Sequence, residues 1–287
     1  MKALVLAGGL GKRLLPLTET IPKPMIPLAG KPILEYVVQY LVNNNLKDIL
    51  MVVGHKKEQI YEYFGSGKDF GAKISYVEQK EPAGIEDAIL TAYPKLEGED
   101  DFLMVHADFV ASDEIISRVL EYHNDLDSDA TIVITLVDDP TLYGAVEIDE
   151  NAKIKRIVEK PRKDEAPSNY AAAGVYLFKE EFLKKLKIAK RFDEAVQSLI
   201  SDGKTVYGMV WERDWTEITY PWDVLKANRF VLAQKLKGKG SFIAESAQID
   251  STAKIEAPVW ISDDVIIRPR AVIRGPSFIG RDSFIGD

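Results

Sequence analysis

The sequence predicts an α/β domain built on a mixed, mostly parallel sheet flanked by helices, followed by a short parallel β-helix. Two patterns carry this prediction. Up to about residue 237, short apolar runs alternate with amphipathic segments, and beyond that point isoleucine recurs every six residues. Alternating strands and helices imply crossover connections, which place helices on the faces of a parallel sheet. We therefore expect two domains, at residues 1–237 and 238–287.

The apolar runs that we expect to form strands are residues 3–6, 49–53, 73–77, 102–105, 130–137 and 145–148. Helix patterns occur at residues 33–43, 57–64, 85–93 and 114–124, and a further helix is expected at 221–237. Ligands of such sheets bind at the carboxyl ends of the parallel strands. The residues that directly follow the predicted strands are therefore the first candidates for a functional site.

The C-terminal region has a strict hexapeptide period. Eight isoleucines recur at intervals of six from Ile243 to Ile285, and a small or β-branched residue follows each of the first seven by four positions. Neither a helical period nor simple alternation produces a period of six, whereas a β-helix of hexapeptides does. The plainer alternative is a run of irregular strands. Because the array stops in mid-repeat at Asp287, we expect that a longer parent chain was truncated or that a partner covers this end.

The composition excludes several classes of function. The net charge is −8, from 37 Lys and Arg against 45 Asp and Glu, so nucleic acid and anionic membranes are poor partners. The absence of cysteine excludes disulfides and thiolate chemistry. The longest uncharged stretch, residues 166–178, is too short and polar to span a bilayer, and the N-terminal apolar run reads as a strand rather than a signal peptide. We expect a cytoplasmic protein.

A glycine-rich loop follows the first predicted strand. Gly8, Gly9 and Gly11 allow close approach of a ligand to the backbone, and successive main-chain amides can bind an anion. Arg13 and Lys23 add positive charge, although both could also be solvated surface cations. The loop is neither a Rossmann fingerprint nor a Walker loop, since GxGxxG and Gly-Lys-Ser/Thr are both missing. The loop alone indicates a phosphate site of undefined type.

Three segments taken together resemble a known signature. They are LAGGLGKRLLPLT at residues 6–18, IPKPM at 21–25 and LAGKPI at 28–33. This combination resembles the signature of the sugar-1-phosphate nucleotidyltransferases, also called NDP-sugar pyrophosphorylases. The resemblance covers essentially the whole chain, because many members append hexapeptide β-helices. It implies a Rossmann-like catalytic domain followed by a left-handed β-helix.

The family joins an NTP to a sugar 1-phosphate and releases pyrophosphate, by in-line attack on the α-phosphorus. Catalysis of this kind rests on positioning and charge stabilisation, without a covalent enzyme intermediate. The match implies that Arg13 holds the leaving pyrophosphate and that Lys23 neutralises charge around the α-phosphate. The match implies that Gly8, Gly9 and Gly11 cradle the nucleotide phosphates and that Leu6 and Ala7 also belong to the nucleotide-binding residues.

The same resemblance implies a magnesium site and a base site. Asp108 follows a predicted strand, and Glu217 lies where relatives carry a second carboxylate in a Trp-x-Asp motif. Both would hold Mg²⁺, which prefers oxygen ligands; Asp108 could instead cap the helix that follows. Gln79 and Gly84 match a Gln…Pro-x-Gly segment that binds a pyrimidine base in thymidylyl- and uridylyltransferases, which favours dTTP or UTP. The plainer reading of that segment is an acidic helix N-terminus.

The sugar 1-phosphate is expected to bind at a later segment. Gly144 matches a glycine that contacts the sugar, Glu159 would bond sugar hydroxyls, and Lys160 would bind the sugar phosphate. A charged pair at an exposed strand end is the alternative for Glu159 and Lys160. Ala172 stands where several relatives carry asparagine.

Two functions from different classes remain open at this stage. The first is an active Mg²⁺-dependent transferase of NTP and sugar 1-phosphate that assembles as a homo-oligomer. The second is a catalytically weak regulatory or nucleotide-sugar-binding paralogue, which the departures at Ala107, Glu217, Glu86 and Ala172 favour. A third, acyltransferase activity, is disfavoured because the three histidines all lie outside the repeats.

Overall fold

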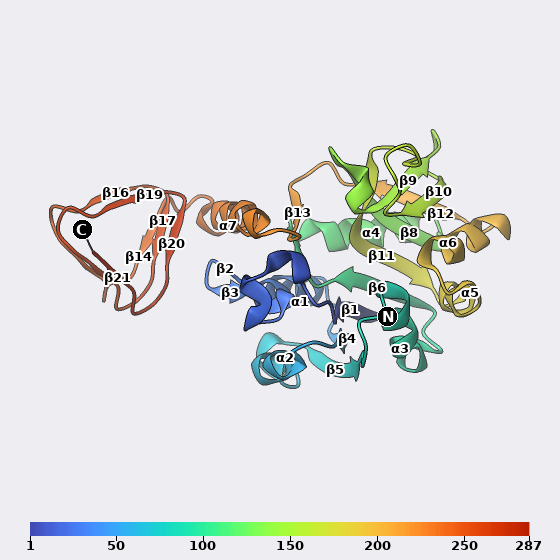
Figure 1. Ribbon diagram of the computed structural model, residues 1–287, viewed down its shortest axis with the longest axis horizontal. Coiled ribbons are helices and arrows are strands. Elements are labelled where there is room, and N and C mark those ends of the chain that lie inside the picture. Colours follow the sequence, from blue (N-terminus) through green and yellow to red (C-terminus); the bar gives the residue numbers. More distant parts are fainter. Residues whose placement is uncertain (287) are drawn as a thin grey trace. The chain divides into compact units, whose positions relative to one another are not determined.

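The first strand of the chain, β1 (Lys2–Ala7), lies inside a nine-stranded sheet, as the computed structural model in Figure 1 shows. The structure describes residues 1–286, so Asp287, the last residue of the expected repeat array, lies outside the described residues. The central strands run parallel in the order β6-β1-β4-β5, with bounds Asp101–His106 for β6, Asp48–Val53 for β4 and Lys73–Glu78 for β5.

The remaining strands of the sheet make it mixed. β11 (Tyr170–Lys179) runs antiparallel to β6 and to β8 (Ala130–Leu136), and β12 (Val206–Val210) extends the sheet parallel to β8. β9 (Gly144–Ile148) pairs with the start of β11 and with β10 (Ile154–Glu159). The expected mixed, mostly parallel sheet is thus confirmed.

Alternating side chains of the buried strands build a core on each face of the sheet. Ala3 and Val5 of β1 pack with α1 (Ile33–Asn43), α2 (Lys57–Phe64) and α4 (Glu114–Asp125). Leu4 faces the other way, toward α3 (Ile85–Leu96), α5 (Glu181–Ala189) and α6 (Phe192–Ser201). This alternation follows from the two-residue period of a strand. Because helices cover both faces, the loops that follow the parallel strands lie at the carboxyl edge of the sheet.

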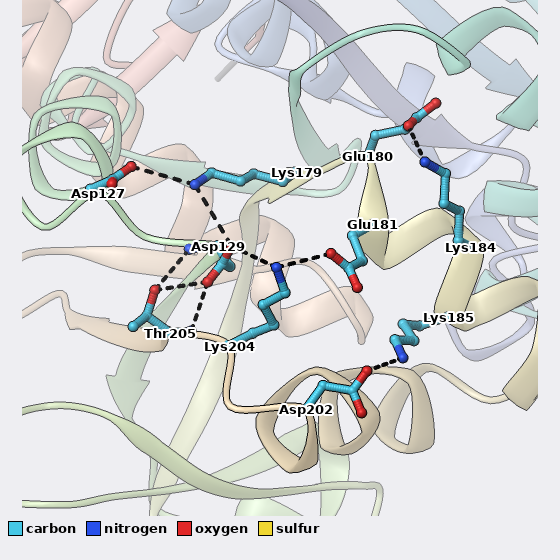
Figure 2. Close-up of polar contacts among 10 residues, drawn as sticks. All are labelled: Asp127, Asp129, Lys179, Glu180, Glu181, Lys184, Lys185, Asp202, Lys204 and Thr205. Atoms are coloured by element: carbon cyan, nitrogen blue, oxygen red, sulfur yellow. Dashed lines mark hydrogen bonds and ion pairs between the residues drawn. The ribbon is translucent and has the colours of Figure 1, made fainter.

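Asp129 joins the beginnings of β8 and β12 through a polar network, which Figure 2 shows. Its carboxylate accepts hydrogen bonds from the backbone N–H of Thr205 at 2.9 Å and from the hydroxyl of Thr205 at 3.1 Å. Lys179 and Lys204 each lie 3.7 Å from the same carboxylate. Burial acts to raise the pKa of Asp129, but these hydrogen bonds and ammonium groups outweigh it and hold the pKa below its usual value of 3.8.

The chain divides into two compact units. The second unit consists of residues 26–32 and the chain from residue 218 onward, and the first unit contains the rest. The second unit holds a short hairpin of β2 (Pro27–Leu28) and β3 (Lys31–Pro32), the helix α7 (Pro221–Leu236) and all of the hexapeptide repeats.

Each of the eight isoleucines of the repeat lies in a short strand. Strands 18 residues apart pair in parallel, so that Ile243, Ile261 and Ile279 stack in one sheet. Two further sheets form in the same way, β15-β18-β21 and β16-β19. The strands are β14 (Phe242–Ile243), β15 (Gln248–Ile249), β16 (Lys254–Glu256), β17 (Val259–Ile261), β18 (Ile266–Ile267), β19 (Val272–Arg274), β20 (Ser277–Ile279) and β21 (Phe284–Ile285).

Within the second unit, α7 packs against the aromatic side chains of the repeats and against the hairpin. The ammonium of Lys235 lies 3.7 Å from the ring centroid of Trp260, a cation–π contact, and Trp260 stacks on Phe242 at 4.3 Å. The side-chain oxygen of Asn228 accepts a hydrogen bond of 2.8 Å from the backbone N–H of Ala29.

The predicted elements of the first unit are confirmed with small shifts at their ends. α1 and α2 have the predicted bounds, whereas α3 continues three residues beyond its predicted end. The sequence patterns did not predict α5, α6, β11 or β12. They also did not predict a separate two-stranded ribbon of β7 (Phe109–Ala111) and β13 (Trp215–Glu217). None of the helices within residues 1–286 has the length and apolar character needed to cross a membrane.

Candidate functional site

The candidate residues gather at the carboxyl edge of the parallel strands. β1, β4, β5 and β6 run in the same direction, so the segments that leave them start at one edge of the sheet. The glycine-rich loop leaves β1, Gln79 directly follows β5, and Asp108 lies two residues after β6. The rule that ligands bind at this edge therefore selects the same residues as the sequence motifs.

The glycine-rich loop packs closely against residues 18–23 through contacts that require glycine at position 11. Gly11 has a φ of 63°, and a Cβ at this position would lie 2.9 Å from the methyl group of Thr18 and 3.1 Å from the Cβ of Lys23. The hydroxyl of Thr18 donates a 2.9 Å hydrogen bond to the carbonyl of Gly11. Arg13 lies on the exposed side of a short 3₁₀ helix, η1 (Lys12–Leu14), within the loop. The close packing of Gly11 fixes the loop against the segment that carries Lys23.

Lys23 and Asp108 form an ion pair across the site. Lys23 begins the 3₁₀ helix η3 (Lys23–Met25), and its ammonium contacts one carboxylate oxygen of Asp108, while the other oxygen, Oδ1, is buried without a hydrogen-bond partner. Burial acts to raise the pKa of Asp108, but the charge of Lys23 outweighs it and holds the pKa below its ordinary value. Asp108 is therefore ionised and has one oxygen available to a further positive ligand.

The ribbon of β7 and β13, which the sequence patterns did not predict, brings the backbone of Glu217 to the segment that follows Asp108. β13 pairs antiparallel with β7, and this register sets Glu217 opposite Phe109, the neighbour of Asp108. Burial, followed by the charges of Glu159, Glu217 and Asp108, raises the pKa of the buried Tyr176 well above its usual value.

The two predicted metal ligands fit Mg²⁺. No group of three or more histidine, aspartate or glutamate side chains suited to a metal occurs within residues 1–286. Mg²⁺ needs fewer, since it is commonly held by one or two carboxylates together with substrate phosphates and water. The unpartnered Oδ1 of Asp108 would supply one such ligand, and Glu217, on the strand paired with the residues that follow Asp108, would supply the second carboxylate. Asp108 does not cap a helix, because it is followed by β7 and α4 begins only at Glu114.

The predicted base-binding residues lie together next to the phosphate loop. Gln79 is 7% exposed, and its amide nitrogen donates to the carbonyl of Gly84 and to the carboxylate of Asp87, both at 2.9 Å. Its carbonyl oxygen faces Gly8, where a Cβ would lie 2.8 Å away. The two hydrogen bonds that its NH₂ group donates therefore fix the orientation of the Gln79 side chain, and its carbonyl oxygen points toward the glycine-rich loop.

The predicted sugar-binding residues also meet. Glu159 pairs with Gly144 in the β10–β9 register, and a Cβ on Gly144 would lie 3.1 Å from the carboxylate of Glu159. Lys160, with a φ of 43°, turns its ammonium to within 3.3 Å of that carboxylate. The Cβ of Ala172 lies 3.8 Å from the same Cβ position on Gly144.

His106 is a site residue to which the sequence reading gave no role beyond packing. Burial lowers its pKa, and the charged groups that act on its ring are Asp108, Glu159, Lys23 and Lys160. Its Nε2 is buried and has no hydrogen-bond partner. The signal that could have identified it is its position at the end of β6, two residues before Asp108. His106 lies opposite Leu6 of β1, close to the start of the glycine-rich loop, and a Cβ on Gly174 of β11 would lie 3.2 Å from its side chain.

The fold and this arrangement define a class of protein, the nucleotidyl transferases. The family model described as "Nucleotidyl transferase" matches residues 2–234, and the chain belongs to this family. Its sheet and flanking helices form the Rossmann-like fold of that family.

The chain is similar to several individual proteins, two of which are named as enzymes of sugar-nucleotide synthesis. The chain is 36% identical to the bifunctional protein GlmU of Methanococcus maripaludis, over 93% of this chain and 62% of the relative. It is 34% identical to the glucose-1-phosphate thymidylyltransferase of Streptomyces antibioticus, over 81% of this chain and 66% of the relative. The structure of the UDP-glucose pyrophosphorylase from Acinetobacter baumanii is similar, with a TM-score of 0.71 and 26% identity over 82% of this chain and 94% of that chain. The chain thus spans about three fifths of the length of its GlmU relative.

Proposed function

We propose that this chain joins an NTP, with dTTP or UTP favoured, to a sugar 1-phosphate, forming an NDP-sugar and pyrophosphate. The observation that carries the proposal is a set of two ion pairs at the ends of the strands: Lys23 with Asp108, two residues after β6, and Lys160 with Glu159, at the end of β10 beside Gly144. Two ammonium groups suit two phosphate-bearing substrates, and the carboxylates suit a divalent cation and sugar hydroxyls. The names of the relatives support the same reaction class.

In this reaction an oxygen of the sugar phosphate attacks the α-phosphorus in line, and the bond to the bridging oxygen of pyrophosphate breaks. The amides of Gly8, Gly9 and Gly11, with Leu6 and Ala7, bind the nucleotide phosphates. Lys23 neutralises charge on the α-phosphate and Arg13 holds the departing pyrophosphate. Preorganised groups of this kind lower the barrier because they need no reorientation as charge develops.

The metal ligands and the sugar residues complete the proposed site. Asp108 and Glu217 would hold Mg²⁺, which when bound supplies charge neutralisation between the phosphates. Glu159 and Gly144 would orient the sugar, and Lys160 would bind its phosphate. Gln79 and Gly84 would receive the base, with the Gln79 oxygen accepting from a uracil or thymine N–H.

The test is a matrix of assays. Purified protein is incubated with Mg²⁺, each of several NTPs and each of several sugar 1-phosphates while pyrophosphate is measured. Release that requires both substrates and Mg²⁺ is expected, strongest with dTTP or UTP. Nucleotide binding with no release for any pair would instead favour a binding paralogue, an alternative motivated by Glu217, whose side chain is one methylene longer than aspartate.

We further propose that residues 1–237 are the transferase domain and that residues 238–287 belong to a left-handed parallel β-helix through which copies of the chain assemble. The parallel pairing of strands 18 residues apart supports a β-helix with three strands per turn. Light scattering of the purified protein tests the assembly, and a monomer at micromolar concentration would contradict it.

A further inference from the structure

The first turn of α6 contacts two separate parts of the candidate site. The turn consists of residues 191–193, at the point where the chain enters the helix. On one side, the backbone N–H of Phe192 donates a 3.2 Å hydrogen bond to the carboxylate of Glu86, at the start of α3. On the other side, α6 packs against β10, and the backbone of Glu159, at the end of β10, acts on the carboxylate of Asp193 as a donor that helps to lower its pKa.

Asp193 is held firmly in this position. It is 9% exposed, and the guanidinium of Arg191 donates to its two oxygens at 3.1 and 2.7 Å. The backbone N–H of Glu194 donates to it at 3.0 Å. Burial acts to raise the pKa of Asp193, but the hydrogen bonds and charge of Arg191 outweigh it and hold the pKa below its usual value, so the group is ionised. Loss of Asp193 would leave the backbone of Glu159 without this anchor.

Glu86 connects the same turn to the nucleotide side. One of its carboxylate oxygens accepts from Phe192, and the other would lie 3.0 Å from a Cβ placed on Gly84. Gly84 in turn accepts from the amide of Gln79. The contacts therefore run from Gln79 through Gly84 and Glu86 to α6, and from α6 to Glu159.

We propose that the first turn of α6 is a bridge that sets the separation of the nucleotide and sugar-phosphate subsites, with Glu86 and Asp193 as its two positioning residues. The inference rests on the proposed function, since it concerns the distance between the two substrates of that reaction. In-line attack depends on holding the reacting atoms about 3–3.5 Å apart, and a misplacement of about 1 Å can cost a hundredfold in rate. Neither residue needs to touch substrate to have this effect.

The kinetic test uses Asp193→Ala, Glu86→Ala and the double variant. Each single change should lower kcat about tenfold, and Asp193→Ala should also raise the KM for sugar 1-phosphate about fivefold with the KM for NTP changed less than twofold. The double variant should be no slower than the slower single variant, because both changes break one bridge. Glu86→Gln retains an acceptor for Phe192 and should stay within twofold of wild type. Glu194→Ala removes the next carboxylate of the helix, which also pairs with Arg191 at 3.3 Å, and is the matched control for loss of a negative charge beside Arg191.

Hydrogen exchange gives a readout that does not depend on turnover. Asp193→Ala should speed exchange in the peptide containing Glu159 at least tenfold, with peptides of β1 unchanged, whereas Glu194→Ala should leave both unchanged. Wild-type protein that releases no pyrophosphate would refute the proposed function. If the wild-type protein is active and the fold-decrease in kcat of the double variant equals the product of the two single fold-decreases, the bridge is refuted. Unchanged hydrogen exchange at Glu159 in Asp193→Ala would also refute it.

Discussion

At the scale of single residues, Lys23 makes the contact on which the proposed chemistry depends most. Its side chain is 15% exposed and pairs with Asp108, so it is a fixed cation in the site rather than a solvated one. Lys23→Ala should lower kcat at least a hundredfold, equivalent to about 3 kcal/mol of barrier. The assay is pyrophosphate release at saturating substrates, with the melting temperature measured in parallel. Lys68→Ala, at an exposed position, should match wild type, and a Lys23→Ala rate within tenfold of wild type would contradict the assignment.

Glu217 is the residue whose length bears most directly on metal binding. Mg²⁺ requires near-octahedral geometry with ligands at about 2.1 Å. Glutamate is one methylene longer than aspartate, so the backbone at residue 217 must lie correspondingly farther from the metal. If the β7–β13 ribbon tolerates either length, Glu217→Asp should maintain or raise the Mg²⁺-dependent rate. The measurement is kcat across a magnesium titration. A loss greater than tenfold would show that this register is built for glutamate.

Most of the candidate residues could be predicted from the sequence, but not the contacts among them. The glycine loop and the strand ends are local signals, which short-range patterns contain. The position of Glu217 opposite the neighbour of Asp108 depends on pairing between residues about a hundred positions apart, and the role of Asp193 depends on its approach to Glu159. Such long-range contacts follow from tertiary packing, which periodicity does not encode.

At the scale of secondary-structure elements, the strands that were predicted are those with a local apolar pattern in the sequence. β1, β4 and β6 are continuous apolar runs because helices cover them on both faces. The strand β11 was missed because its first half is a run of alanines, residues 171–173, which shows neither alternation nor β-branched residues. Its alanines are nevertheless fully or almost fully buried, which small side chains permit where strands and loops crowd together.

The junction of β8 and β12 gives a prediction about stability and pH. Because the pKa of Asp129 is held below its usual value of 3.8, the ionised group stabilises the folded state above that value, and this contribution is lost as the pH falls through the lower, folded-state pKa. Asp129→Asn should lower the free energy of unfolding by about 1 kcal/mol at pH 7. The difference from wild type should shrink progressively below about pH 4.

The measurement is urea unfolding at a series of pH values. Asp127→Asn is the matched control, because its side chain is 98% exposed and contacts only Lys179 within this network (Figure 2). We expect the control to stay within about 0.5 kcal/mol of wild type throughout. If Asp129→Asn lowered the free energy of unfolding by the same amount from pH 7 to pH 3, the stabilisation by Asp129 would not be electrostatic.

At the scale of the whole molecule, each compact unit has a hydrophobic core of its own, and the core of the repeats is made by hexapeptide isoleucines together with small or β-branched residues such as Val259, Val265 and Ala271. Ile261 is fully buried in this core, whereas Ile243, which pairs with it from 18 residues earlier in the chain, is 46% exposed. Ile261→Ala should therefore destabilise the repeats by about 3 kcal/mol, since truncation removes buried methyl groups and leaves a cavity. Ile243→Ala should cost less than about 1 kcal/mol. Hydrogen exchange of peptides from residues 255–285 measures both effects, with peptides of β1 as an internal reference; equal effects of the two substitutions would contradict a core built from the hexapeptide period.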